Sequence, residues 1–309
     1  MLEPGKVIRG RYRITAPLAR GGMGELFCAD DLKTGTPAVI KTLLPSLLDR
    51  VDLVALFFEE AELTARLRHP RIVRVYDYGS DENCRCFMAM ERLVGATLGA
   101  MMRRSYEEDR GLDAEVVMAA GIQLCEALEH GAHACGPDGV RMALVHRDLS
   151  PLNVFVTEKG CVKLLDFGIA RVAGASRHRS SSALRGKPSY RSPEMVRGEY
   201  VDARSDLFTL GIILWEALAG RKLFCSQPIE ESERRILTMR IPKISRLRPS
   251  VPAGLDLIVA RMLCRDPRMR FQEAAELGTA LRSVYRMTTD RRQHHVLRDA
   301  VRHSGAQEP

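Results

Sequence analysis

The stretches LVHRDLSPLN, residues 144–153, and KLLDFGIAR, residues 163–171, decide how this chain is interpreted. Asp148 can accept a proton from a hydroxyl group, while Asn153 and Asp166 offer the oxygen ligands that Mg²⁺ prefers. A metal ion held there would neutralise charge on the β- and γ-phosphates of a nucleotide during phosphoryl transfer. Each short motif occurs by chance, but the two in this order and spacing indicate a phosphoryl-transfer site.

A glycine cluster upstream, LARGGMGELF at residues 18–27, lies between two expected strands. Glycine lets the backbone adopt unusual angles and approach a phosphate closely, so that amide N–H groups can reach it. Most glycine clusters are turns, so this one is weak evidence by itself. Its strand-to-strand context excludes a Rossmann or Walker site, in which the glycines lead from a strand into a helix.

Lys41, in an expected strand at residues 36–43, has a predicted partner in Glu60. Glu60 shares a helical face with three leucines, and a carboxylate on such an apolar face is costly unless it is paired. The leucines are Leu56, Leu63 and Leu67. A lysine held by a glutamate can contact the α- and β-phosphates of a nucleotide. A buried ion pair with a purely structural role is the alternative.

The order of elements predicts the fold class. The first part of the chain is typical of strands at residues 11–19, 25–31, 36–43, 71–79 and 84–93, with one helix at 51–69. After Gly95 helices are expected at residues 114–134, 204–220, 253–265 and 271–287. Strands followed by helices predict an α+β fold, with a small β-rich lobe and a larger helical lobe. The charged last stretch, residues 288–309, is expected to extend the final helix and then fray.

Composition and charge are those of an ordinary globular protein. The 309 residues are 45% hydrophobic and 28% charged, enough for a sizeable core. The net charge of +8 is spread along the chain without a long Lys/Arg run, so it indicates a basic surface and no nucleic-acid partner. The eight cysteines include no CxxC pair and no zinc-ligand spacing, which predicts reduced thiols in a cytoplasmic protein.

No secretory signal or membrane segment is expected. The first ten residues lack an apolar run, and the most apolar stretch, residues 207–220, is shorter than a membrane span and contains Glu216. This stretch therefore predicts a buried helix.

Together the motifs resemble a eukaryotic-type serine/threonine protein kinase of the kind that bacteria also make. The resemblance rests on the glycine-rich loop, Lys41, Glu60, HRDLSPLN, DFG at 166–168, SPE at 192–194, RSDLFTLG at 204–211 and DPRMR at 266–270. It implies a protein-kinase-like bilobal fold. The expected parts are an N-terminal tail at 1–11, a kinase domain at 12–282 with an N-lobe at 12–92 and a C-lobe at 93–282, and a basic C-terminal tail at 283–309.

By this resemblance the chain would bind ATP between its lobes and use Mg²⁺ to transfer the γ-phosphoryl group to protein serine or threonine hydroxyls. Asp148 would position and deprotonate the hydroxyl, and Lys41, held by Glu60, would orient the phosphates. Asn153 and Asp166 would hold Mg²⁺. The residues expected around the nucleotide are Leu18, Ala19, Gly21, Gly22, Met23, Gly24, Leu26, Val39, Lys41, Glu60 and the backbone groups of Glu91 and Leu93.

The resemblance assigns roles to three further residues. Met90 would be the gatekeeper beside the adenine. Glu194 would pair with Arg270 and so anchor the activation segment.

Four positions depart from the family pattern. Ala19 replaces the first glycine of the loop, and Val39 replaces the usual alanine against the adenine. Ser150 replaces a lysine that would contact the γ-phosphate, whereas Lys187 stands where the family usually has a threonine. The two changes resemble an exchange, because a flexible ammonium at position 187 could reach the space of one at position 150. Lys187 is therefore predicted to be catalytic.

Regulation on the activation segment is implied by Arg147, which precedes Asp148. The segment SRHRSSSALRG, residues 176–186, carries Ser180, Ser181 and Ser182 as candidate autophosphorylation sites, and a phosphoserine there could pair with Arg147. A homodimer would let one copy phosphorylate another. The alternative is a mobile polar loop without modification.

The main alternative function is a pseudokinase, a nucleotide-binding scaffold without turnover, which Ala19, Val39 and Ser150 favour. The chain retains Lys41, Glu60, Asp148, Asn153 and Asp166, and this argues against the pseudokinase alternative. A small-molecule kinase is disfavoured because such enzymes generally lack the DFG-to-SPE segment. The sequence identifies neither the protein substrate nor the signal.

Overall fold

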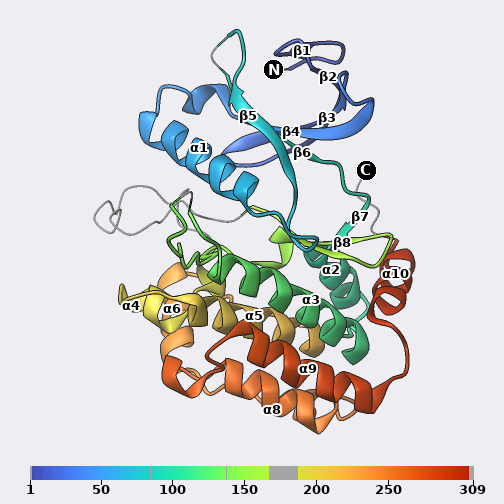
Figure 1. Cartoon of the computed structure of the whole chain (residues 1–309). Coiled ribbons are helices and arrows are strands. Elements are labelled where there is room, and N and C mark those ends of the chain that lie inside the picture. Colours follow the sequence, from blue (N-terminus) through green and yellow to red (C-terminus); the bar gives the residue numbers. More distant parts are fainter. Residues whose placement is uncertain (1, 84, 137, 167–186, 306–309) are drawn as a thin grey trace. The chain divides into compact units, whose positions relative to one another are not determined.

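The computed structural model describes residues 2–83, 85–136, 138–166 and 187–305. The described chain divides into two compact units, one made of residues 2–93 with Asp166, and the other of residues 94–165 and 187–305. Figure 1 labels the elements of both units.

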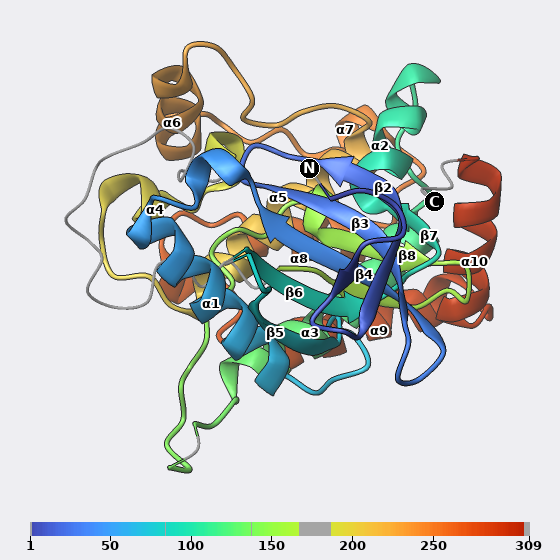
Figure 2. The same cartoon turned by 90° about the horizontal axis from the view of Figure 1, so that it is seen from above.

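The first unit is a six-stranded antiparallel sheet with one long helix. The strand order is β1-β2-β3-β4-β6-β5, and Figure 2 labels the five strands from β2 to β5 in this order. Four of the largest side chains of its core, Tyr12, Phe27, Ile40 and Phe87, are at most 1% exposed. The elements are β1 (Val7–Ile8), β2 (Tyr12–Arg20), β3 (Gly24–Asp31), β4 (Thr36–Leu43), the helical turn η1 (Pro45–Leu47), α1 (Val51–Arg66), β5 (Val75–Ser80) and β6 (Cys86–Glu91).

Helix α1 packs against β5 and β6. Its buried side chains are Leu53, Phe57, Ala61 and Thr64, so the buried stripe does not pass through Leu56 and Leu63 as the leucine pattern predicts. The helix ends at Arg66, three residues before the end at residue 69 that the sequence predicts. Leu67 already has extended angles there, because the chain must turn toward β5.

The segment expected as an N-terminal tail contributes β1 to the sheet. Val7 and Ile8 pair with Arg13 and Tyr12 of β2. Leu2 and Ile8 are buried in the same core cluster as Tyr12. Apolar burial therefore holds this segment in the first unit.

The second unit is mainly helical, with α3 against α5, α9 and α10. It also contains a three-stranded sheet, β7-β8-β9, which the sequence does not predict because each strand is only three or four residues long. No described helix has the length and apolar character needed to cross a membrane. The elements are β7 (Gly95–Thr97), α2 (Leu98–Glu107), α3 (Ala114–Ala132), η2 (Pro151–Asn153), β8 (Val154–Thr157), β9 (Val162–Leu164), η4 (Pro188–Tyr190), α4 (Pro193–Arg197), α5 (Ala203–Ala219), α6 (Ile229–Thr238), α7 (Ile244–Leu247), α8 (Ala253–Met262), η5 (Pro267–Met269), α9 (Ala274–Thr288) and α10 (Gln293–Ser304).

The prediction that the last stretch extends the final helix is wrong. Helix α9 ends at Thr288, Thr289 is extended, and a separate helix α10 follows. Helix α10 buries Val296, Leu297 and Val301. The β8–β9 turn fits closely against it, since a Cβ atom on Gly160 would lie 1.8 Å from the carbonyl oxygen of His294. Because these apolar side chains are buried, residues 293–304 form a packed helix and do not fray as the charge pattern suggests.

Candidate active site

The glycine-rich loop is the turn between β2 and β3. Residues up to Arg20 lie in β2, Gly24 begins β3, and the Gly21 N–H donates to the Gly24 carbonyl at 2.9 Å. A Cβ on Gly24 would lie 2.4 Å from the Thr42 carbonyl oxygen, so β3 and β4 can pair here only with glycine. Ala19 lies in β2 opposite Leu26, an extended position that does not require glycine. Of the predicted loop residues, Leu18, Ala19, Gly24 and Leu26 lie in the strands, and Gly21, Gly22 and Met23 in the turn.

Lys41 is held between two carboxylates. Its ammonium Nζ lies 2.7 Å from Glu60 Oε1 and 3.0 Å from Asp166 Oδ1. Burial lowers the pKa of Lys41, but the charges of Asp166 and Glu60 outweigh it and the pKa is raised. Burial also raises the pKa of Glu60, an effect that Lys41 opposes and Asp166 reinforces. Lys41 is therefore a fixed cation, and the predicted Lys41–Glu60 contact is present.

The predicted adenine-side residues lie on β4 and at the end of β6. Val39 and Met90 are register partners, exposed by only 7% and 8%. Glu91 is fixed by Arg74, whose N–H donates to the Glu91 carboxylate at 2.8 Å and whose carbonyl accepts the Glu91 N–H at 2.9 Å. Leu93, two residues on, is half-buried.

The loop that carries Asp148 is shaped by a buried carboxylate. Asp206 in α5 accepts the N–H groups of His146 at 2.7 Å and Arg147 at 3.0 Å. Arg147 has a φ of 62°, an uncommon value for a residue other than glycine. Burial raises the pKa of Asp206, and His146 and the two N–H groups oppose this. Asp206 thus holds a strained turn directly before Asp148.

Asp148 and Asn153 are in contact. The Asn153 side-chain Nδ2 donates to the Asp148 carbonyl at 2.9 Å and approaches its Oδ2 at 3.4 Å. The Asn153 carbonyl accepts the N–H of Leu165, the residue before Asp166. Because Nδ2 is the donor, Oδ1 is the atom of this amide that can bind a metal. This amide oxygen is a hard ligand of the kind that fits Mg²⁺.

Lys187 reaches the position of the missing lysine. Its Nζ lies 3.3 Å from the Ser150 hydroxyl oxygen, although the two residues are 37 positions apart. Partial desolvation lowers the pKa of Lys187, the negative charge of Asp148 opposes this, and the positive charge of Lys222 adds to it. The two residues of the predicted exchange are therefore in contact, with the Lys187 ammonium within the electrostatic reach of Asp148, and the catalytic role of Lys187 stays a prediction.

Comparison with known protein families and solved structures identifies the family of this chain. Residues 12–280 match the protein kinase domain family. The chain belongs to the protein kinase family. The resemblance drawn from the motifs and the α+β fold class are both confirmed.

Relatives of this kinase occur in several bacteria. The tyrosine-protein kinase MasK of Myxococcus xanthus is 33% identical over 88% of this chain and 42% of its own length. The serine/threonine-protein kinase PknB of Mycobacterium leprae is 32% identical over 89% of this chain and 43% of its own length. The crystal structure of the PknI kinase domain of Mycobacterium tuberculosis superposes with a TM-score of 0.67 at 26% identity, over 92% of this chain and 99% of that one. The chain spans less than half the length of these two curated relatives.

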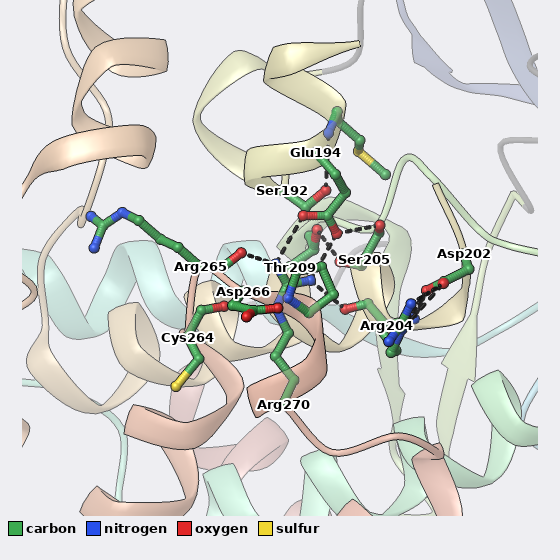
Figure 3. Close-up of polar contacts among 12 residues, drawn as sticks. Ser192, Glu194, Asp202, Arg204, Ser205, Thr209, Cys264, Arg265, Asp266 and Arg270 are labelled. Carbon is green, nitrogen blue, oxygen red and sulfur yellow. Dashed lines mark hydrogen bonds and ion pairs between the residues drawn. The ribbon is translucent and has the colours of Figure 1, made fainter. Parts of the chain in front are cut away.

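The kinase also has the predicted Glu194–Arg270 pair, shown in Figure 3. Arg270 is fully buried and donates to Glu194 Oε1 at 2.7 Å and Oε2 at 2.8 Å. The Ser205 hydroxyl donates to the same carboxylate at 2.5 Å. The pair ties α4, next to the activation segment, to the loop that contains η5.

Sequence reasoning missed a second polar cluster in the kinase. Tyr190 donates to Glu216 Oε2 at 2.6 Å, and Lys222 lies 3.0 Å from the same oxygen. A signal existed, because Glu216 interrupts the most apolar run of the chain and so needs a partner, as Glu60 does. Lys222 could not be found this way, since it looks like an ordinary surface lysine.

Phe167 and Gly168 of the DFG motif and the candidate phosphorylation sites Ser180, Ser181 and Ser182 lie outside the described residues.

Proposed function

We propose that this kinase transfers the γ-phosphoryl group of ATP, in the presence of Mg²⁺, to serine or threonine hydroxyls of proteins. The observation that carries the proposal is the arrangement around Asp148. Asn153 contacts Asp148, and the Lys187 ammonium lies beside Ser150, two residues further along the same loop. A base and a cation together support turnover and weigh against the pseudokinase alternative.

In the proposed reaction the substrate oxygen attacks the γ-phosphorus while its proton passes to Asp148. A new P–O bond forms, the bond from the γ-phosphorus to the bridging oxygen breaks, and ADP leaves. Lys41, fixed by Glu60, orients the α- and β-phosphates. Mg²⁺ bound by Asn153 and Asp166 would neutralise charge on the β- and γ-phosphates.

The nucleotide pocket is proposed to consist of the glycine-rich loop, Val39 and the backbone of Glu91 and Leu93. The proposed kinase domain is residues 12–282. Serine or threonine is favoured over tyrosine because the loop after HRD lacks the Ala/Arg signature typical of tyrosine kinases. Cytoplasmic location and a homodimer stay predictions from the sequence.

The direct test is phosphate transfer from labelled ATP with Mg²⁺ to the chain itself, to an acidic protein and to a basic protein. Label on any of them that disappears with EDTA would support the proposal. If no label appears but ATP raises the melting temperature, the chain binds nucleotide without turnover and the pseudokinase alternative takes its place.

Lys187→Thr is expected to lower the transfer rate about 10²-fold, because it removes a cation that stabilises developing charge. Adding Ser150→Lys to the same chain restores a lysine and a hydroxyl in exchanged positions, so most of the rate should return. Rates of the wild type, both single variants and the double variant should be measured under saturating ATP. An unchanged rate for Lys187→Thr would rule out the exchange.

Autophosphorylation is expected on Ser181 or Ser182. A phosphate there could pair with Arg147 and order the segment. Mass spectrometry should find phosphate on protein expressed alone and none on protein co-expressed with a phosphatase. Asp148→Asn protein serves as the control, because phosphate on that variant would have to come from another kinase.

A further inference from the structure

The turn η4 follows Lys187 directly and ends at a tyrosine that is held inside the fold. The Tyr190 N–H donates to the Lys187 carbonyl at 3.0 Å, which closes the turn. Tyr190 is only 7% exposed, and its carbonyl accepts the hydroxyl of Thr209 in α5 at 3.0 Å. The position of the Lys187 backbone therefore depends on how firmly Tyr190 is held.

The phenol of Tyr190 lies between a buried carboxylate and a cation. Its hydroxyl donates to Glu216 Oε2 at 2.6 Å and accepts a hydrogen bond from the Lys222 ammonium at 2.6 Å. Lys222 also contacts Glu216 Oε2 at 3.0 Å, and its Nζ lies 5.2 Å from the centre of the Tyr190 ring. The side chain of Glu216 is 0% exposed and that of Lys222 is 46% exposed, so Lys222 closes this network on its solvent side.

The charge of Lys222 stabilises the contact between Glu216 and Tyr190. Glu216 also accepts the Leu223 N–H at 2.9 Å, but a backbone N–H does not neutralise its charge. A buried carboxylate that has lost its cation is strongly unfavourable. Entry of water or protonation of Glu216 would relieve this cost, and either change would weaken its bond to the Tyr190 hydroxyl. We therefore expect η4 to loosen when the ammonium of Lys222 is removed.

The Lys187 side chain is the part of this segment that reaches the catalytic loop. Its Nζ lies 3.3 Å from the Ser150 hydroxyl oxygen. Lys187 is exposed and has a long flexible stem, so this single contact does not fix the ammonium by itself. The backbone position that η4 sets decides whether the ammonium can reach Ser150.

We propose that Lys222 is a positioning residue, which holds Tyr190 and with it η4, so that the Lys187 ammonium stays beside Ser150. The proposal rests on the proposed function, because it assumes that Lys187 assists phosphoryl transfer. Lys222 needs no contact with the substrate for this role, since its effect passes through Tyr190 and Lys187.

The test measures phosphate transfer from saturating labelled ATP by the wild type, Lys222→Met, Lys187→Thr and the variant with both changes. Lys222→Met should lower the rate about tenfold, because displacing a catalytic group by about 1 Å can cost up to about 10²-fold. In the Lys187→Thr background the same change should lower the rate less than about twofold, since the group that Lys222 positions is absent. A loss caused only by a weaker fold would be equal in both backgrounds.

Hydrogen exchange at the turn gives a second measurement, which does not require activity. The Tyr190 N–H closes the turn, and its exchange can be followed by mass spectrometry of a peptide that covers residues 187–191. This exchange should be faster in Lys222→Met than in the wild type. The matched control is Arg221→Met, which removes the adjacent exposed cation, whose guanidinium lies 5.9 Å from the centre of the Trp215 ring. The control should leave both the exchange and the transfer rate unchanged.

The two measurements separate failure of this inference from failure of the proposed function. If the wild type transfers no phosphate, the proposed function fails, and the exchange at Tyr190 still decides whether Lys222 fixes the turn. Unchanged exchange in Lys222→Met, or the same change of rate in both backgrounds, overturns the inference. If the melting temperature shows that Lys222→Met does not fold, Lys222→Met combined with Glu216→Gln takes its place, because that variant leaves no buried charge.

Discussion

Asp148→Asn is expected to lower phosphate transfer by about 10²–10⁴-fold, the usual contribution of a general base. Asparagine has nearly the same shape as aspartate but cannot accept the proton of the substrate hydroxyl. The contact from Asn153 to the backbone carbonyl of residue 148 does not involve the changed side chain, so the loop should keep its form. Initial rates with labelled ATP should fall, while the rise in melting temperature caused by ATP and Mg²⁺ should be retained.

A matched control for this variant is Asp138→Asn, which changes an exposed aspartate that caps a turn before the same loop. It should transfer phosphate at the wild-type rate. If Asp148→Asn were also as fast as the wild type, a different group would have to take the proton and the role assigned to Asp148 would be wrong.

One contact of the site could be predicted from the free-energy cost of burying an unpaired carboxylate. A carboxylate on an apolar helix face needs a partner, and this predicts the 2.7 Å contact between Lys41 and Glu60. The same cost applies to Glu216, which lies in the most apolar stretch, so its need for a buried partner was also encoded. The partners of Glu216 could not be predicted from the sequence. Tyr190 lies in the helical turn η4 and Lys222 follows the end of α5, and the position of both segments depends on the whole fold.

The elements that sequence reasoning missed are those that depend on tertiary packing. Strands β7, β8 and β9 have too few residues to show a period. The partner of β7 is β8, about 60 residues further along the chain. In α10 the apolar positions Val296, Leu297 and Val301 fit a helix. The break at Thr289 that separates α10 from α9 has no glycine or proline to announce it, so the two helices looked like one.

Arg270→Met is expected to destabilise the fold by about 3–5 kcal/mol, the cost of leaving one partner of a buried ion pair behind. Arg270 is 0% and Glu194 only 4% exposed, so the carboxylate could not turn to water. The guanidinium also donates to the carbonyls of Cys264, Arg204 and Arg265, which would lose their donors. Urea unfolding of both proteins should measure the difference.

The control is Arg268→Met, two residues away. Arg268 is 83% exposed and contacts Asp266 on the surface, so its loss should cost about 1 kcal/mol or less. Equal losses for the two variants would mean that the Glu194–Arg270 pair does not anchor the segment. Glu194→Gln combined with Arg270→Met should recover part of the stability, because no buried charge then remains.

The pH dependence of the stability lost in Arg270→Met follows from the pKa of Glu194. Burial raises the pKa of Glu194, but Arg270 and Ser205 outweigh this, and the pKa lies below its usual value in the wild type. The stabilisation is then present above the pKa of an unfolded glutamate and is lost only as the pH falls through the lower, folded value. In Arg270→Met burial acts without the arginine, the pKa of Glu194 should rise, and protonation should relieve the buried charge. The stability difference between the two proteins should therefore be largest near neutral pH and shrink in acid, whereas a loss caused only by missing packing would stay constant.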